Sequence, residues 1–357
     1  MKKVILIIIL LIILFNIKTN KKEEIEDRSI FISYIELNKY LNNKTIDESK
    51  LSINNMINNI KNTNINTIIL QVRSNQDSIY LNSIFPHSEY INKDFDCLDY
   101  FIKKSHDNNI KLIAWINPYR VNTKNEIKES LKNSISYKYI NNNTYISDGI
   151  YLIPSRKETE DLILKGIDEV LKYKVDGILF DDYFYQSPNI DENPLQVINN
   201  TIEKVHKKCI NKKVLFGISP DGNIDNNYNK NMADVKTWMS SDKYIDFIMP
   251  QIYYGFYNST RDYVRVTKEW EQLLKNDNIK FYVALAFYKV GIEDKYAKDG
   301  REEWINNNDI IMREVILSRN LKNYKGFALF RYDNLFDEEI YTTTSKDELE
   351  NLKKIIK

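Results

Sequence analysis

The sequence predicts an α/β protein whose fold class is a (β/α)8 TIM barrel with an N-terminal signal or anchor segment. Three observations favour it: eight short β-branched runs, amphipathic stretches between them, and a length of 357 residues. Barrels of eight strand–helix units span about 200 to over 400 residues. Near-continuous apolar runs such as residues 67–70 are typical of strands covered on both faces, and strand–helix alternation indicates parallel pairing.

Residues 1–27 are predicted to be a signal peptide or membrane anchor plus a linker, and residues 28–357 the barrel. Two lysines precede an apolar run from Val4 to Phe15, as in a secretory signal. The run is shorter than the roughly 20 apolar residues of a transmembrane helix. No small-residue cleavage site follows it, so cleavage stays open. We expect the barrel to be extracytoplasmic, either secreted or tethered to the membrane at the cell surface.

The remaining elements follow in order along the chain. The predicted strands are residues 30–34, 67–73, 111–117, 176–182, 213–219, 245–251, 280–286 and 326–331. Helical spacing groups Leu51, Met56, Ile57 and Ile60 on one face, and Leu162, Ile163, Ile167, Val170 and Leu171 on another. The Asn-, Tyr- and Ser-rich stretch 121–155 is expected to be a long loop at the active-site face.

The composition argues against several classes of function. The chain has 51 Lys and Arg against 50 Asp and Glu, a formal net charge of +1, and this balance argues against a nucleic-acid partner. Only nine glycines occur and no phosphate-binding glycine motif follows a strand, which disfavours the alternative of a doubly wound nucleotide-binding sheet. The two cysteines, Cys97 and Cys209, form no CxxC pair. The three histidines lie apart, so we expect no metal and no cofactor.

Polar and aromatic side chains gather where the predicted strands end. In a TIM barrel the carboxyl ends of the strands form the active site. Amides, arginines and tyrosines there are typical of a groove for a polyhydroxylated ligand. The predicted substrate-binding residues are Arg73, Asn117, Tyr119, Arg120, Tyr183, Gln251, Tyr253 and Arg331.

Asp181 and Asp182 follow the fourth predicted strand and are the predicted catalytic residues. Glycoside hydrolysis generally needs one protonated and one ionised carboxyl group, and adjacent carboxylates push their pKa values apart. Regular alternation sends the two side chains to opposite faces, so using both requires a bend or bulge. The structural alternative is that one aspartate points inward and the other caps a helix or pairs with an arginine. Glu36 and Asp221 could supply a more distant carboxylate, or could equally be helix caps or salt-bridge partners.

Six segments, in this order, resemble the glycosyl hydrolase-like family ten of exported bacterial barrels: QVRSNQDSIYLNSIFPHSEY, LIAWINPYRV, VDGILFDDYFY, GISP, YIDFIMPQIYY and ALAFYKVG. The resemblance spans about residues 28–333. It implies the barrel fold, hydrolysis of a cell-surface polysaccharide, and the aspartates after the fourth strand as the catalytic centre. This chain departs from the family pattern at Ile153, Asp221 and Tyr254, and these departures concern the sugar-binding subsites.

The resulting hypothesis is an exported monomeric glycoside hydrolase that cleaves an amino-sugar-containing wall or surface polysaccharide, either peptidoglycan or a de-N-acetylated glucosamine glycan. Asp182 would be the general acid/base. Asp181 would be the ionised partner that stabilises an oxocarbenium-like transition state or orients a 2-amino or 2-acetamido group. A non-catalytic glycan-binding barrel attached to the cell envelope is the alternative. A metal-dependent deacetylase is disfavoured because no histidine lies near the aspartates in sequence.

Overall fold

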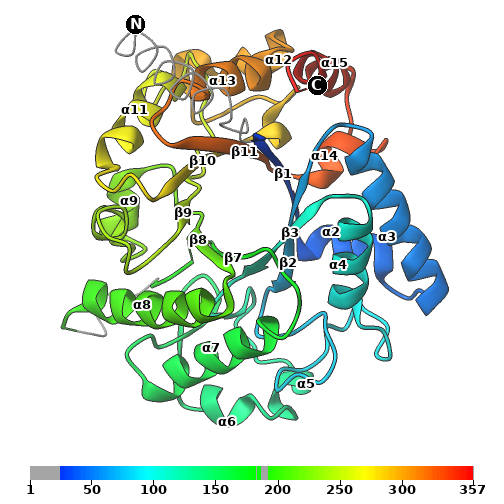
Figure 1. Ribbon diagram of the computed structural model, residues 1–357, viewed down its shortest axis with the longest axis vertical. Coiled ribbons are helices and arrows are strands. Elements are labelled where there is room, and N and C mark those ends of the chain that lie inside the picture. The colour runs from blue at the N-terminus through cyan, green and yellow to red at the C-terminus, as the bar shows by residue number, and fades with distance from the viewer. Residues whose placement is uncertain (1–24, 182, 186–191, 357) are drawn as a thin grey trace, which may run out of the picture.

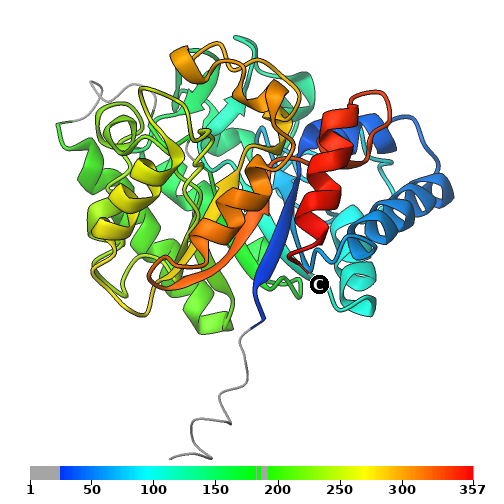
Figure 2. The ribbon, with the colours of Figure 1, turned by 90° about the horizontal axis from the view of Figure 1, so that it is seen from above.

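Eight parallel strands close into a barrel, as the sequence predicts. The computed structural model describes residues 25–181, 183–185 and 192–356. The barrel order is β1-β11-β10-β9-β8-β7-β3-β2, and β1 pairs with β11 to close it (Figures 1 and 2). The strands are β1 (Asp27–Ile32), β2 (Thr67–Arg73), β3 (Lys111–Ile116), β7 (Gly177–Phe180), β8 (Leu215–Ile218), β9 (Phe247–Ile248), β10 (Lys280–Leu285) and β11 (Tyr324–Leu329).

Helices surround the strands (Figure 1). They are α2 (Tyr34–Leu41), α3 (Ile46–Lys61), α4 (Cys97–Asp107), α5 (Glu129–Lys132), α6 (Tyr137–Ile140), α7 (Lys157–Val170), α8 (Pro194–Lys212), α9 (Ile224–Asn229), α10 (Val235–Trp238), α11 (Tyr263–Leu273), α12 (Glu303–Asn306), α13 (Ile310–Ser318), α14 (Tyr332–Phe336) and α15 (Thr343–Lys353). The described residues also include two 3-10 helices, η2 (Phe287–Lys289) and η3 (Lys298–Gly300).

Side-chain alternation divides the core into two parts. Residues such as Phe31, Ile69, Leu179 and Tyr282 point into the barrel and form an inner cluster. Their neighbours along each strand pack outward against the helices in a larger cluster. The predicted apolar face of α7 is buried. The α3 prediction is wrong at Leu51, which is 61% exposed, because Ile53 rather than Leu51 shares the face of Met56, Ile57 and Ile60.

The stretch 121–155 is more ordered than the expected loop. It carries a three-stranded sheet of β4 (Arg120–Asn122), β6 (Ile150–Leu152) and β5 (Thr144–Ile146), together with α5 and α6. Tyr145 and Tyr151 stack at 5.8 Å between ring centroids across the antiparallel pair β5–β6. This sheet places the start of β4, and therefore Arg120, beside the carboxyl ends of the barrel strands.

Candidate active site

A cavity of about 250 Å³ opens at the carboxyl ends of the barrel strands. Seven of the barrel strands, all but β10, or the segments that follow them contribute to it, which is the position of active sites in TIM barrels. Its lining consists of Phe31, Ser33, Tyr34, Ile35, Gln71, Trp115, Asn117, Arg120, Asp181, Tyr183, Ser219, Gln251, Tyr253, Phe330 and Arg331. Asp181 is the one carboxylate among these described lining residues.

Asp181 follows β7 and is 3% exposed. Burial in the cavity wall raises the pKa of its carboxyl group to about 6, against the opposing effects of the Arg120 charge and of a hydrogen bond from Trp115. The Trp115 indole Nε1 donates to Asp181 Oδ2 at 3.2 Å, and the backbone N–H of Tyr183 donates to Oδ1 at 3.4 Å. Asp181 is therefore a carboxyl group that titrates close to neutral pH.

Arg120 and Tyr183 form one side of the cavity. The Arg120 guanidinium carbon lies 5.0 Å from the centre of the Tyr183 ring, within the range of a cation–π contact. Arg120 Nε donates to the backbone oxygen of Ser74 at 3.3 Å, which fixes the guanidinium against the loop after β2. A positive charge thus lies close enough to Asp181 to favour its ionised form.

A relay of two side-chain amides fixes the orientation of Asn117. The backbone N–H of Tyr34 donates to Gln71 Oε1 at 3.0 Å, so the other Gln71 atom, Nε2, must donate to Asn117 Oδ1, at 2.8 Å. Asn117 is 1% exposed, and its Nδ2 has no hydrogen-bond partner among the described residues. Asn117 therefore offers a buried donor that no described residue satisfies, and a ligand could supply its acceptor.

Arg331 lies on the opposite side, after β11. Its Nε is 3.2 Å from Glu36 Oε1, and its Nη1 donates to Ser33 Oγ at 3.1 Å. Glu36 and Ser33 also form the capping box of α2. Glu36 is fully buried and forms a cap and an ion pair, so the structural alternative for this residue is confirmed.

Aromatic rings line much of the cavity. Tyr253 packs against Phe330 at 5.8 Å and Tyr288 at 5.7 Å, and Phe31 packs edge-on against Trp115 at 5.5 Å. Gln251 donates through Nε2 to the backbone oxygen of Ser219 at 3.0 Å. The lining thus combines ring faces with polar groups, as sugar recognition requires.

Two predicted substrate-binding residues do not line this cavity. The pairing register of β2 with β3 shifts between Gln71 and Arg73, so the side-chain alternation that keeps Gln71 inside is broken before Arg73. Arg73 instead is buried, with its guanidinium carbon 3.8 Å from the centre of the Phe85 ring. Tyr119 is 1% exposed and packs against Phe184 in the outer core.

The other predicted site residues have different outcomes. Asn117, Arg120, Asp181, Tyr183, Gln251, Tyr253 and Arg331 come together in the cavity. Asp182 lies outside the described residues. Asp221 accepts hydrogen bonds from the backbone N–H of Asn223 and from Asn226, just before and within α9, and so acts as a local cap.

Sequence reasoning missed Gln71, Trp115, Ser33 and Ser219 as lining residues. Trp115 and Gln71 could have been found, because each lies two residues beyond an inward-facing residue of its strand, Ile113 or Ile69. Among the described residues, no group of three or more His, Cys, Asp or Glu side chains could hold a metal ion. His206 and His106 instead pair with Asp246 and Asp176.

The family Glycosyl hydrolase-like 10 matches residues 26–201 and 192–301. The chain belongs to this family. It is 30% identical to the glycosyl hydrolase DigH of Escherichia coli O6:H1 (strain CFT073), over 76% of this chain and 73% of DigH. It is 26% identical to the glycosyl hydrolase YngK of Bacillus subtilis (strain 168), over 82% of this chain and 64% of YngK.

Solved structures share the fold of this family member. The endo-1,4-beta-mannanase of Rhizomucor miehei superposes with a TM-score of 0.58 at 15% identity, over 93% of this chain and 95% of the mannanase. The PgaB (BpsB) glycoside hydrolase domain of Bordetella bronchiseptica gives 0.54 at 11% identity, over 93% and 99%. At these identities the likeness establishes the barrel fold alone. In the part of the chain that the structure describes, no helix is long and apolar enough to cross a membrane.

Proposed function

We propose that the protein is an exported glycoside hydrolase that cleaves an amino-sugar-containing polysaccharide of the bacterial cell wall or surface. Peptidoglycan and a de-N-acetylated glucosamine glycan are the two candidate substrates. The observation that carries the proposal is Asp181, a buried carboxyl group with a pKa of about 6 in a cavity of amides and aromatic rings. Membership of a glycosyl hydrolase-like family supports it.

In this proposal Asp181 acts as the ionised partner. With a pKa of about 6, the carboxyl group is mainly ionised at neutral pH and becomes protonated as the pH falls below 6. An ionised carboxylate beside the sugar ring stabilises an oxocarbenium-like transition state electrostatically, or orients a 2-amino or 2-acetamido group for substrate assistance.

Asp182 is the proposed general acid/base, because glycoside hydrolysis needs a proton donor to the leaving oxygen. The charged and amide donors of Arg120, Asn117 and Arg331 would hold the hydroxyl or acetamido oxygens of the sugar next to the scissile bond. Tyr183, Gln251 and Tyr253 would complete this binding site. The cavity is smaller than the 300–1,000 Å³ typical of pockets for drug-sized ligands, so it suits a short piece of a polymer.

The test is the release of new reducing ends from purified wall glycan. We expect the protein to release them from native peptidoglycan, from chemically de-N-acetylated peptidoglycan, or from both, with a product ladder visible by mass spectrometry. A ladder from only one preparation identifies the acetylation state that the enzyme prefers. Absence of products from both preparations contradicts the proposed activity on this glycan.

A non-catalytic glycan-binding barrel is the second candidate function. The aromatic rings and amides that line the cavity would serve this function as well as they serve hydrolysis. Such a protein would co-sediment with peptidoglycan without releasing reducing ends, so the same assay separates the two functions.

A further inference from the structure

A second hollow adjoins the candidate active site and is separate from the residues assigned to hydrolysis. This hollow, which we call the Tyr34 groove, has a volume of about 320 Å³. Its lining consists of Tyr34, Asn38, Asn42, Asn75, Asp77, Glu89, Tyr90, Asn122, Thr123, Lys124, Glu126 and Lys128. Tyr34 lines both the groove and the active-site cavity, so the two hollows are neighbours on the same face of the barrel.

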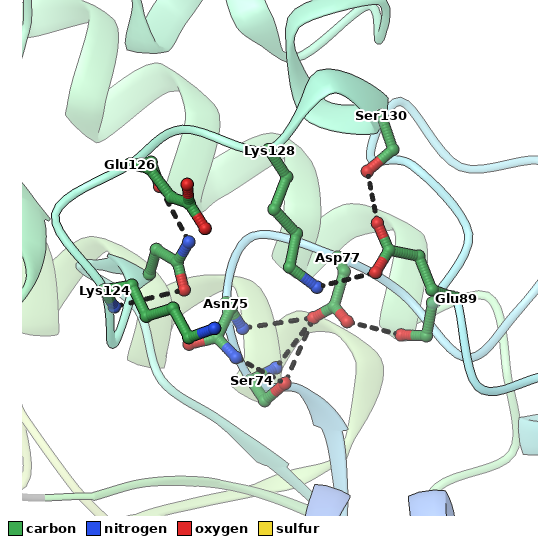
Figure 3. A network of polar contacts seen from close by, with 10 residues as sticks. Ser74, Asn75, Asp77, Glu89, Lys124, Glu126, Lys128 and Ser130 are labelled. Atoms are coloured by element: carbon green, nitrogen blue, oxygen red, sulfur yellow. Dashed lines mark hydrogen bonds and ion pairs between the residues drawn. The ribbon is translucent and has the colours of Figure 1, made fainter. Parts of the chain in front are cut away.

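Asp77 fixes the floor of the groove by accepting several hydrogen bonds. Its Oδ1 accepts from the backbone N–H of Ser74 at 3.3 Å, from Ser74 Oγ at 3.2 Å and from the backbone N–H of Asn75 at 3.1 Å. Its Oδ2 accepts from Ser88 Oγ at 2.5 Å. Figure 3 shows these contacts converging on Asp77. With both oxygens accepting hydrogen bonds, the Asp77 side chain is fixed in place and shapes the groove.

Glu89 joins two walls of the groove. Lys128 Nζ lies 3.0 Å from Glu89 Oε2, and Ser130 Oγ donates to Oε1 at 3.1 Å (Figure 3). These contacts tie the loop after β2 to the start of α5. A groove whose walls are held together in this way is pre-organised, and pre-organisation lowers the entropic cost of binding.

Arg120 links the groove to the active-site cavity. The Arg120 guanidinium lines the cavity, and its Nε donates to the backbone oxygen of Ser74, the residue whose N–H and hydroxyl are held by Asp77. The loop from Ser74 to Asp77 is therefore attached to both hollows. A ligand that extends from one hollow to the other would lie along this loop, which is held in place on both sides.

Several polar side chains of the groove remain available. Asn38, Asn42 and Glu126 are exposed, and none of their side chains forms a hydrogen bond with another described residue. Lys124 and Glu126 carry opposite charges, while Lys128 is paired with Glu89. The lining holds three acidic and two basic side chains, a near balance of charge, together with amide groups and the rings of Tyr34 and Tyr90. This chemistry suits hydroxyl and acetamido groups better than an ion.

We propose that the Tyr34 groove binds an uncharged, N-acetylated sugar unit of the proposed glycan, next to the unit held in the active-site cavity. This inference rests on the proposed function, and it adds that the protein recognises internal stretches of a polymer longer than the cavity alone can hold. Asn38 and Asn42 would donate to the sugar, and Tyr34 would contact the units on both sides of the junction.

The test measures the affinity of the full-length protein for β-1,4-linked N-acetylglucosamine oligomers of two, four and six units by calorimetry. We expect the wild type to bind six units more tightly than two. The double variant Asn38→Ala/Asn42→Ala should weaken binding of six units about tenfold, because two hydrogen bonds are lost, and should leave binding of two units unchanged. The matched control is Asn55→Ala/Asn58→Ala, which removes two exposed asparagines of α3 and should change neither affinity.

The possible outcomes separate this inference from the proposed function. Equal binding of six units by the wild type and by the Asn38→Ala/Asn42→Ala variant would overturn the groove as a sugar subsite, while leaving the proposed hydrolase intact. Binding of two units with no gain from greater length would do the same. Failure of the wild type to bind any oligomer would contradict both proposals for glycans of this type.

Discussion

Asp181 is buried, and the ionised form of its carboxyl group therefore lowers the stability of the folded protein. Its pKa is about 6 in the folded protein and close to 3.8 in an exposed aspartate. A raised folded pKa means that the stabilising, protonated form is fully present below about pH 4, and that its contribution is lost as the pH rises through about 6. At pH 7 the ionised carboxyl group therefore lowers the free energy of unfolding by about 3 kcal/mol.

Replacing Asp181 by asparagine is expected to stabilise the protein at neutral pH. The free energy of unfolding of Asp181→Asn should exceed that of the wild type by up to about 3 kcal/mol at pH 7, and the gain should vanish near pH 4. Urea unfolding at the two pH values measures both quantities. Asp94→Asn, at an exposed carboxylate, is the control and should change stability by less than about 0.5 kcal/mol. A lower free energy of unfolding for Asp181→Asn than for the wild type at pH 7 would contradict the cost assigned to burying the ionised carboxyl group.

Gln71 is expected to set which atom Asn117 presents to the sugar. In Gln71→Glu, the carboxylate would accept from both the Tyr34 N–H and Asn117 Nδ2, and the Asn117 amide would turn to present its oxygen to the cavity. We expect substrate binding to weaken about tenfold while the protein remains folded. Isothermal calorimetry and circular dichroism measure the two effects.

Two outcomes decide the role of Gln71. The control Gln196→Glu, on the exposed start of α8, should bind substrate like the wild type. Unchanged affinity in folded Gln71→Glu would show that the orientation of Asn117 does not depend on Gln71.

At the scale of residues, the alternation of side chains along each strand predicts many of the residues that line the cavity. It places Asn117 on the inner face with Ile113 and Trp115, and Asp181 with Leu179. It fails at Arg73 because an irregularity in β2 reverses the side-chain direction, and nothing in the local sequence marks that irregularity. Tyr119 lies three residues beyond the end of β3, after Pro118, where the alternation that still holds for Asn117 has ended.

At the scale of elements, the displaced Arg73 determines how α7 packs on β2. Gly166 of α7 lies against the Arg73 guanidinium, and a Cβ atom at this position would lie 1.7 Å from Arg73 Nη1 and 3.0 Å from the Phe85 ring. Close approach of the helix to a buried arginine therefore requires glycine here.

The substitution Gly166→Ala tests this packing by the sign of its effect. In an exposed helix, alanine would raise the free energy of unfolding by about 1 kcal/mol. Here we expect overpacking, which typically costs about 1–3 kcal/mol, to outweigh that gain, so the variant should be less stable than the wild type. Urea unfolding measures the change, with the exposed neighbour Lys165→Ala as the control. A more stable Gly166→Ala would show that Arg73 moves aside easily.

The small sheet in the segment between β3 and α7 could not be predicted from sequence periodicity. Its three strands contain three residues each, too few for periodicity to be visible. Long-range pairing of β4 with β6 creates the small sheet, and only the folded barrel brings these strands together.

At the scale of the whole molecule, all eight barrel strands could be predicted because each is a short apolar run between amphipathic helices.

Burial raises the pKa values of several carboxyl groups in this large fold. Burial raises the pKa of Glu348 to about 7 and that of Glu314 well above its usual value, in the same direction as Asp181.

The stability of the protein should therefore decrease as the pH rises from 5 to 8. Each of these groups contributes stability in its protonated form, which is present below its unfolded pKa and lost as the pH passes its folded value. Thermal unfolding at pH 5, 6, 7 and 8 should show a falling midpoint temperature. The substitution Glu348→Gln, in α15, keeps a side chain of similar size against the backbone N–H groups at the start of α13 and should reduce the decrease. A midpoint that rises steadily over this range contradicts the account.

The central claim is that this barrel hydrolyses a glycan through the carboxyl group of Asp181. The most direct measurement compares the release of reducing ends from amino-sugar wall glycan by the wild type and by folded Asp181→Asn at pH 7. We predict that the wild type releases products and that the variant loses at least about a hundredfold in rate, as expected when a group that stabilises transition-state charge is removed. Equal rates for the wild type and the variant would contradict the claim.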